Sequence, residues 1–550
     1  MAHFLTPWRW AAALVLFLVA GLPLALPLAD LALHGISGWT AHDTNRVGHL
    51  LLNTILLIAG TLALALPVGT ALAIVLFRTE FSGRRFLLAC IVALLFVPLP
   101  MFTSAWQAFF GSDGWWRLRL WGENAGRPWT TGILPAIWVH FLAGLPWVVL
   151  FVGLGLSWVE RELEEDGLLL GPPWWVLWRL TLPRCKGAIL FAGVWLALQT
   201  AGEISVTDMM LVNTFAEEVQ TQFTAGDRGG VARAVLAALP LTIVTWGLLA
   251  WWVPRLERLL PPLQVRLAEP RRFSWGRWHW PVVLLASLLV FMSVGLPLFS
   301  LLWKLGQAGH PPLWSAATAW GHFDKVLQNG TDLEIVWQSL FTSAAAGAMV
   351  SLSALALCWL AEDSPWLRRA IIAVLALAWA LPGTIVGIGL KDTIAWLPEG
   401  VAADWFYYGP SPLPLAWAYV VRFLPFAVAL LWPVVRLVPR EPREAARLEG
   451  QGPWREFWTV VWPLTRREAL VCGVLVAALC LGEVAASTRV ETPGWESFAK
   501  LLFDRMHYGV TNDVAALSLL LVISVAGIAL LVWLAPEVAR LLRNLRPFRS

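Results

Sequence analysis

The sequence has few charged residues for its length. Of 550 residues, 14% are Asp, Glu, Lys or Arg, whereas 58% are hydrophobic. A soluble domain usually has about 25% charged and about 45–50% apolar residues, so this composition excludes a soluble enzyme and a disordered tail. The net charge of +4 is too small to indicate a nucleic-acid partner. We therefore predict a polytopic membrane protein.

Motifs for nucleotide and metal chemistry are also missing. The five lysines follow Cys, Trp, Asp, Leu and Ala, so the Gly-Lys pair of a P-loop is absent. None of the five cysteines belongs to a CxxC pair, and the chain has no HExxH segment. We expect no cofactor, metal site or catalytic residue in this chain. Any energy would then come from a partner or an ion gradient.

Long apolar runs occupy most of the chain. A membrane-spanning helix needs about 20 mostly apolar residues. The runs are continuous, which excludes the alternating strands of a membrane barrel. The predicted fold class is therefore an all-α polytopic membrane protein with about 12 transmembrane helices. The twelve predicted spans are 10–30, 50–77, 86–110, 131–159, 187–202, 234–253, 280–303, 335–360, 370–390, 413–435, 469–482 and 514–535.

Lysine and arginine are distributed unevenly between the loops that join these spans. One set of loops holds 27 of the 40 basic residues, and the other set holds 11. Loops rich in Lys and Arg usually stay in the cytoplasm. We expect a multi-pass protein of the plasma (inner) membrane, surrounded by lipid bilayer, with both termini in the cytoplasm.

The chain repeats itself at an offset of about half its length. Arg84-Arg85 and Arg368-Arg369 are 284 residues apart, and Gly202-Glu203 and Gly482-Glu483 are 280 apart. Six spans return each half to the same side, which makes the repeat parallel. The predicted domains are a six-span half at 1–253, a linker rich in Pro and Arg at 254–279 and a second half at 280–550.

A long loop precedes the predicted span 469–482. It contains Glu444-Ala445-Ala446, and Gly450 and Pro463 follow. The segment before Gly450 contains good helix formers, and glycine supplies the positive φ that ends a helix. Pro463 is predicted to mark the start of the next span. The loop therefore reads as two short helices joined by a turn, a shape suited to docking on another protein.

This loop resembles the EAA loop of ABC importer permeases, which reads Glu-Ala-Ala, three residues, Gly and a later Leu-Pro. Gly450 and Pro463 keep the spacing of 13 residues. The repeat-related loop departs more, because Glu164-Glu165 precedes Asp166-Gly167, and Gly171 lies 12 residues before Pro183. One residue is missing from the pattern and Gly167 weakens a helix. We expect the first loop to be shorter or weaker.

The resemblance covers nearly the whole chain and is to importers of iron(III), thiamine and related substrates, with two fused six-span permease domains. It implies that two cytoplasmic ATPase subunits bind ATP and dock on the loops, and that a periplasmic or extracellular binding protein delivers the substrate. Loops that merely lie on the membrane surface are the alternative. The implied coupling residues are Glu164, Glu165, Gly171, Pro183, Glu444, Ala445, Ala446, Gly450 and Pro463.

Four polar residues lie within or at the ends of predicted spans. Arg422 and His140 occupy equivalent places in spans ten and four, and a charge there is costly, by about 2.5–3.5 kcal/mol. Glu203 and Glu483 end spans five and eleven. One hypothesis is that all four line or gate a pathway. The alternatives are a structural contact, such as Arg422 with Glu483, and solvated acids at helix ends.

Two other functions remain open. A gradient-driven secondary transporter would need carboxylates within its spans, and these spans have almost none apart from Glu203 and Glu483. A membrane glycosyltransferase would need paired carboxylates on an outer loop, where the acids are scattered. Iron(III) is the first substrate expectation, by family frequency alone; thiamine, polyamines, phosphonates and other anions remain possible.

Overall fold

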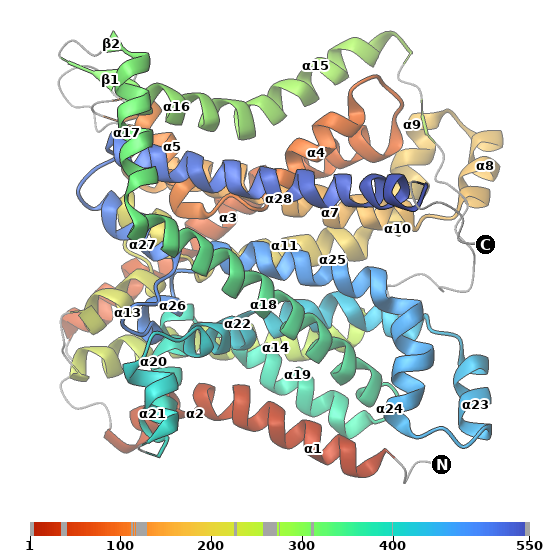
Figure 1. The fold of residues 1–550 in the computed structure, drawn as a ribbon. Coiled ribbons are helices and arrows are strands. Elements are labelled where there is room, and N and C mark those ends of the chain that lie inside the picture. Colours follow the sequence, from red (N-terminus) through yellow and green to blue (C-terminus); the bar gives the residue numbers. More distant parts are fainter. Residues whose placement is uncertain are drawn as a thin grey trace.

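The computed structural model describes residues 5–34, 41–111, 114, 116, 129–224, 228–256, 272–273, 276–309, 313–398 and 400–544. Its long helices run side by side along one common axis, and the short elements gather at the two ends of this bundle (Figure 1). Most of the predicted linker, 254–279, lies outside the described residues.

The first part of the chain supplies the helices that carry the first loop and one side of the bundle. They are α1 (Thr6–Leu16), η1 (Phe17–Gly21), α2 (Leu22–His34), α3 (Ala41–Arg78), α4 (Arg84–Leu94), α5 (Leu99–Phe110), α7 (Ile133–Ser157), α8 (Arg161–Leu170), α9 (Pro173–Val176), η2 (Leu177–Thr181), α10 (Leu182–Arg184), α11 (Lys186–Ala201), α12 (Ser205–Met209), α13 (Phe215–Thr224) and α14 (Arg228–Leu256).

The second part supplies a similar series and one two-stranded sheet. The elements are η3 (Gly276–Trp278), α15 (His279–Val290), η4 (Phe291–Gly295), α16 (Leu296–Leu305), β1 (Gln307–Ala308), β2 (Leu313–Trp314), α17 (Ala316–Gln328), α18 (Gly330–Ala361), α19 (Pro365–Ala380), α20 (Gly383–Ala395), α21 (Val401–Ala403), η5 (Asp404–Tyr408), α22 (Leu413–Arg436), α23 (Arg440–Leu448), α24 (Pro453–Glu456), η6 (Phe457–Val461), α25 (Trp462–Leu481), α26 (Ser487–Val490), α27 (Phe498–Met506) and α28 (Asn512–Asn544).

These helices confirm the predicted all-α membrane fold. Within the described residues, six helices are long and apolar enough to cross a membrane, or up to nine if each bent pair is one span. Every predicted run falls on a helix or a bent pair. The bends are sharp, with 106° between α4 and α5 and 113° between α19 and α20. Pro98 and Pro382 stand just before α5 and α20, where their missing N–H groups break the helix.

Irregular turns recur in the two parts of the chain. The π-helical turns η2 and η6 are 280 residues apart, the same offset as the two Gly-Glu pairs. A second pair, η1 and η4, interrupts the first long helix of each part. A π turn inserts an extra residue into a helix and is rare. Its recurrence agrees with the sequence repeat, while the domain boundaries at 253 and 280 stay a prediction.

The first helices of each part pack on the other part. Helix α2 lies against α20, and α16 lies against α5. The indole Nε1 of Trp417 in α22 donates to Val19 O at 2.8 Å, and Ser300 Oγ in α16 donates to Ala105 O at 2.7 Å. Such hydrogen bonds remove the cost of burying polar groups among apolar ones. The two parts are therefore interlocked rather than placed side by side.

Helices α18 and α25 meet closely at Gly347. A Cβ added at this residue would come closer than 3.0 Å to the carbonyl oxygen of Gly473. Small residues of this kind let helix backbones approach each other in membranes. We expect Gly347→Ala to destabilise the detergent-solubilised protein by about 1–3 kcal/mol, because a backbone oxygen cannot yield as a side chain can.

Thermal unfolding followed by intrinsic tryptophan fluorescence measures this effect. The matched control is Gly527→Ala in α28, where no atom lies within 4 Å of the added Cβ. The control should unfold at or above the wild-type temperature. Equal behaviour of the two variants would contradict close packing at Gly347.

Candidate functional site: two paired loops and a central charged cavity

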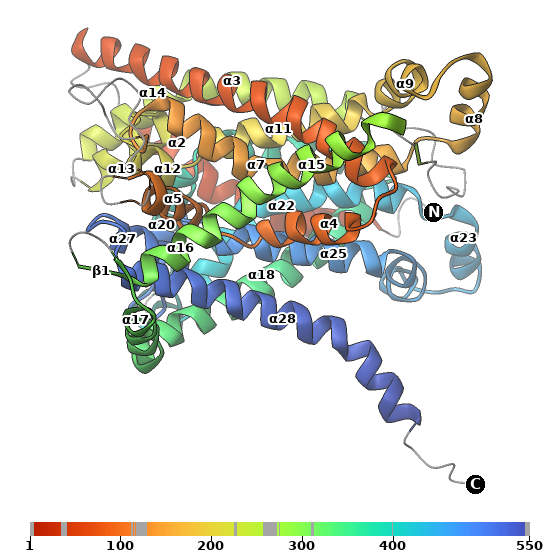
Figure 2. The same ribbon diagram turned by 90° about the horizontal axis from the view of Figure 1, so that it is seen from above.

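The loop before α25 has the predicted helix–turn–helix form. Gly450 has a φ of 75°, the left-handed conformation expected of it, and Gln451 N donates to Ala446 O at 3.1 Å. Helix α24 follows the turn, and α25 begins at Trp462, so Pro463 lies in the first turn of a helix. This loop and the loop of α8 and α9 project at the same end of the bundle (Figures 1 and 2).

Helix α23 has an exposed face and a face bound to the rest of the protein. Glu444 and Ala445 are exposed. On the inner face, Arg443 Nε donates to Glu456 Oε1 at 2.9 Å and Arg447 Nε donates to Glu456 Oε2 at 2.7 Å. Burial alone would raise the pKa of Glu456, but the hydrogen bonds from Arg447 and Arg443 outweigh it and hold that pKa below its usual value. The network keeps α23 and α24 together.

The loop of α8 has one buried acid and one exposed acid. Glu164 is fully buried and accepts hydrogen bonds from Arg78 Nη2 at 2.7 Å and Thr181 Oγ1 at 2.7 Å. Glu165 is partly exposed and pairs with Arg161 at 2.8 Å one turn away. Both acids are predicted coupling residues, but only Glu165 is accessible to a partner protein. Glu164 holds the loop in place from within.

The first loop is one residue shorter than the second between its glycine and its proline, but its first helix is not shortened. Weaker docking by the first loop stays a prediction. Helix α8 has 10 residues and α23 has 9. Gly167 lies inside α8 against Leu180, where an added Cβ would come closer than 3.0 Å to the leucine side chain. The close packing that glycine allows offsets its poor helix propensity. Helix α8 ends at Leu170, Gly171 follows it in extended backbone, and Pro183 is exposed in α10.

The four polar residues predicted within or beside the spans line one cavity of about 130 Å³. His140 Nε2 in α7 lies 3.6 Å from Glu203 Oε2, and Arg422 Nε in α22 lies 3.9 Å from Glu483 Oε1. Both distances exceed a normal hydrogen bond. Arg422 and Glu483 form an ion pair, and His140 and Glu203 form one when the imidazole is protonated. The contact of Arg422 with Glu483, one of the alternatives left open, is present. A role of the four residues in a pathway stays a prediction.

Both glutamates also hold the beginnings of short helices. Glu203 Oε2 accepts from Val206 N at 2.9 Å in α12. Glu483 accepts from Ala486 N and Ser487 N, each at 2.9 Å, at the start of α26. A carboxylate is stabilised by the unpaired N–H groups and dipole of a helix N-terminus. These bonds fix each carboxylate toward the basic side chain of a neighbouring long helix.

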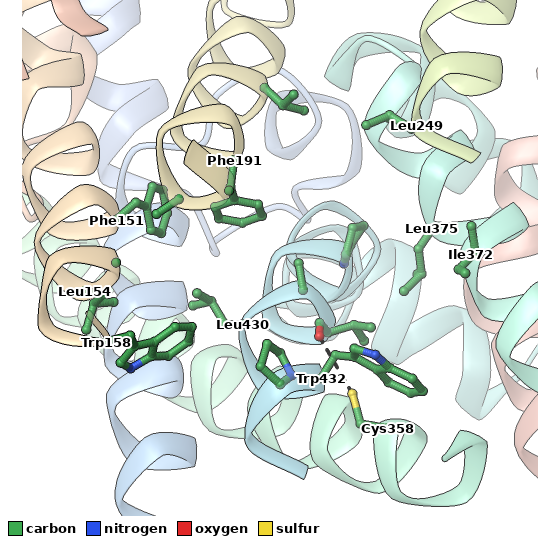
Figure 3. Close-up of a pocket in the computed structure, with 18 of the residues that line it drawn as sticks. Phe151, Leu154, Trp158, Phe191, Leu249, Cys358, Ile372, Leu375, Leu430 and Trp432 are labelled. Carbon is green, nitrogen blue, oxygen red and sulfur yellow. Dashed lines mark hydrogen bonds between the residues drawn. The ribbon is translucent and has the colours of Figure 1, made fainter. Parts of the chain in front are cut away.

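An aromatic cluster lies between this cavity and a larger apolar one. Trp147 borders the charged cavity, and Trp195 and Phe426 pack with ring centroids 4.4 Å apart. Phe151, whose ring centroid is 6.2 Å from that of Phe426, borders the second cavity. This cavity has a volume of about 250 Å³ and is lined by side chains of both parts of the chain, including Trp432 (Figure 3).

At the opposite end of the bundle, side chains join the two parts directly. Asp208 Oδ2 in α12 lies 2.9 Å from His507 Nε2, just after α27. Arg489 in α26 donates to Gln220 Oε1 in α13. Burial raises the pKa of Asp208, and His507 opposes this rise. The structure is therefore closed between the parts at this end and hollow nearer the α8 and α23 loops.

Sequence reasoning missed the partners that hold the loops. Arg78 and Glu164 are 86 residues apart, and Arg443 and Glu362 are 81 apart, so no local spacing reveals either pair. One signal was available. The repeat aligns Arg78 with Glu362 at the offset of 284. Because these two residues have opposite charges, the residues that pair with them are also expected to have opposite charges. The same comparison gives no signal for Asp208 and His507.

Comparison with known proteins gives partial matches. No family model matches the chain. The molybdenum transport system permease protein ModB of Azotobacter vinelandii is 35% identical over 129 residues, 23% of this chain and 57% of that protein. The Fe(3+)-transport system permease protein FbpB 2 of Haemophilus influenzae is 22% identical over 475 residues, 84% of this chain and 85% of that protein. The thiamine transport system permease protein ThiP of Escherichia coli is 29% identical over 126 residues, 22% of this chain and 23% of that protein.

The alignment with ModB thus spans little more than half of that relative, whereas the alignment with FbpB 2 spans most of both chains. Other relatives are named for sulfate transport. All of these proteins are transport permeases rather than enzymes, in agreement with the long apolar helices of this multi-pass membrane protein. The chain is therefore similar to ABC importer permeases, among them permeases named for Fe(3+) and thiamine transport.

Proposed function

We propose that the chain forms the whole translocation pathway of an ATP-driven importer and binds two cytoplasmic ATPase subunits. The observation that carries this proposal is the pair of helix–turn–helix loops, which occupy repeat-related positions and project at one end of the bundle. Two docking loops on one chain suit two ATPase subunits. A binding protein delivers the substrate at the other end.

The end with α8 and α23 is the cytoplasmic one in this proposal, and the membrane is the plasma (inner) membrane. Loops at this end contain most of the 27 basic residues counted in one set of loops. Helix α1 begins and α28 ends there, which agrees with cytoplasmic termini (Figure 1).

The central residues have named roles in this pathway. Arg422 of α22 and His140 of α7 meet Glu483 and Glu203 just beyond the ends of α25 and α11, and the four residues form a polar constriction. The aromatic cluster separates it from the apolar cavity nearer the cytoplasm. ATP-driven closure of the ATPase subunits moves the two loops together, separates the halves at Asp208 and His507, and opens the pathway outward.

We propose iron(III) as the substrate, since a relative that aligns over most of both chains is named for Fe(3+) transport. Relatives named for molybdenum, sulfate and thiamine transport align over shorter stretches. An uptake assay with the reconstituted complex should therefore compare iron(III) with these three solutes. The described residues contain no group of three or more His, Cys, Asp or Glu able to hold a metal ion. The constriction therefore acts on the passing solute through single charged groups.

Purification of the tagged chain from the cells that naturally produce it tests the proposal. We expect an ATPase to co-purify at two copies per chain, and Gly450→Val to reduce this at least about tenfold, because a β-branched residue is strained at a φ of 75°. The matched control is Gly452→Ala in the same turn, where φ is −68° and no atom lies within 4 Å of the added Cβ.

The same preparation separates the alternatives. Uptake into vesicles under an ion gradient, without any ATPase in the preparation, would favour a secondary transporter. Turnover of a lipid-linked sugar would favour a glycosyltransferase. Equal ATPase recovery with Gly450→Val and wild type would remove the second loop from the docking surface.

A further inference from the structure

Two ion pairs at repeat-related positions have opposite polarity. In the first half, Arg78, the last residue of α3, pairs with Glu164, the fourth residue of α8. In the second half, Glu362 follows the last residue of α18 and pairs with Arg443, the fourth residue of α23. Each pair joins the end of a long helix to the first helix of a loop. The acid and the base have exchanged places.

Both pairs are built as tight, buried contacts. Arg78 donates to both oxygens of Glu164, at 2.7 and 3.1 Å, and neither side chain is exposed. Arg443 donates to Glu362 and to Glu456, with 5% of its own side chain exposed. An arginine that donates two bonds fixes direction as well as distance. Helix α8 is thus held in one orientation relative to α3, while Arg443 ties α23 both to Glu362 at the end of α18 and to Glu456 in α24.

The long helices that end at these pairs pack along helices that border the central cavity. Helix α3 packs along α7, which carries His140, and α18 packs along α22, which carries Arg422. The α3–α7 contact is close next to the first pair, because a Cβ at Gly153 would come closer than 3.0 Å to the ring of Phe77. A displacement of α8 or α23 is therefore passed to helices that border the polar constriction.

We infer that Arg78–Glu164 and Glu362–Arg443 are coupling pairs, which transmit the movement of each loop to the pathway. This inference rests on the proposed function and assigns positioning roles to four residues. The opposite polarity of the two halves indicates that a direct contact between opposite charges is needed at each loop. It does not matter whether the long helix or the loop helix supplies the cation. The molecule itself shows that either arrangement is compatible with the fold.

Charge exchange in the first half tests the inference in the full complex with ATPase subunits and binding protein, reconstituted in liposomes. Arg78→Glu and Glu164→Arg each place like charges together. We expect each to lower the number of solute molecules imported per ATP hydrolysed at least about tenfold, while ATP hydrolysis continues. The double variant Arg78→Glu/Glu164→Arg adopts the polarity of the second half. It should restore this ratio to within about threefold of wild type.

Further variants keep the test decisive. Arg78→Lys retains the charge but loses the two-bond geometry, and we expect an intermediate ratio even if Arg78→Glu does not fold. Glu80→Gln is the control, because Glu80 forms an exposed ion pair with Arg272 at the same end, 2.8 Å apart. Its import ratio should equal that of wild type.

The outcomes separate the inference from the proposed function. A wild-type complex without ATP-dependent import would overturn both. Active wild type with unchanged ratios in Arg78→Glu and Glu164→Arg would overturn the coupling pairs alone. Lowered ratios in both single variants without recovery in the double variant would also reject the pairwise contact as the cause.

Discussion

Replacement of Arg422 by leucine is expected to lower the import rate at least about tenfold, measured as solute uptake by the reconstituted complex. Arg422 lies 3.9 Å from Glu483 and borders the central cavity. The leucine variant leaves a buried carboxylate without its cation, which costs about 3–5 kcal/mol when one partner of a buried pair is removed. Two bonds from α26 still hold Glu483 in place, so the variant should insert and fold.

A double variant separates a role on the solute from a role in the fold. Arg422→Leu/Glu483→Gln removes both charges, and the amide oxygen can still accept a bond from α26. If Arg422 acts on the passing solute, the double variant stays slow although it is as stable as wild type. Recovery of wild-type import in the double variant would mean that Arg422 serves only to neutralise Glu483.

The double variant Asp208→Cys/His507→Cys is expected to lose import when a short thiol-reactive reagent links its two cysteines. If the linker contains a disulfide, a reducing agent should cleave it and restore import. The two side chains lie 2.9 Å apart and join the halves at the end away from α8 and α23. A link there prevents the separation that the proposed opening toward a binding protein requires. Uptake should fall at least about tenfold in the linked protein.

The control places a link within one half. His322 and Asp513 lie 2.7 Å apart on α17 and α28, and His322→Cys/Asp513→Cys should import normally after the same treatment. The native cysteines are buried or partly buried, and each single-cysteine variant accounts for their reaction with the reagent. Full import by cross-linked Asp208→Cys/His507→Cys would exclude separation of the halves at this end.

The sequence predicted those features that depend on residues close together in the chain. Apolar runs of about 20 residues predict helices wherever they occur, because the membrane core forces the backbone to satisfy its own hydrogen bonds. The turn at Gly450 follows from the backbone freedom of glycine, and its φ of 75° confirms it. The breaks before α5 and α20 follow from the missing N–H groups of Pro98 and Pro382, but their angles depend on packing that the sequence does not show.

Which helix faces which could not be predicted from composition. Lipid tails and protein interiors are equally apolar, so a buried leucine and a lipid-facing leucine look alike in sequence. The interlocking of the two halves could therefore not be predicted from the sequence. The residues that line the central cavity could be predicted for two reasons. Arg422 and His140 are polar residues within apolar runs, and Glu483 and Glu203 occupy repeat-related positions.

The interlocked first helices have a consequence for biosynthesis. Val19 accepts its hydrogen bond from Trp417, which the ribosome adds 398 residues later. Since synthesis runs from the N-terminus, helices α1 and α2 spend most of translation without the surfaces they finally cover. The first half cannot complete its packing until the second has been inserted. A single polypeptide keeps both partners of this exchange in the same patch of membrane and in equal number.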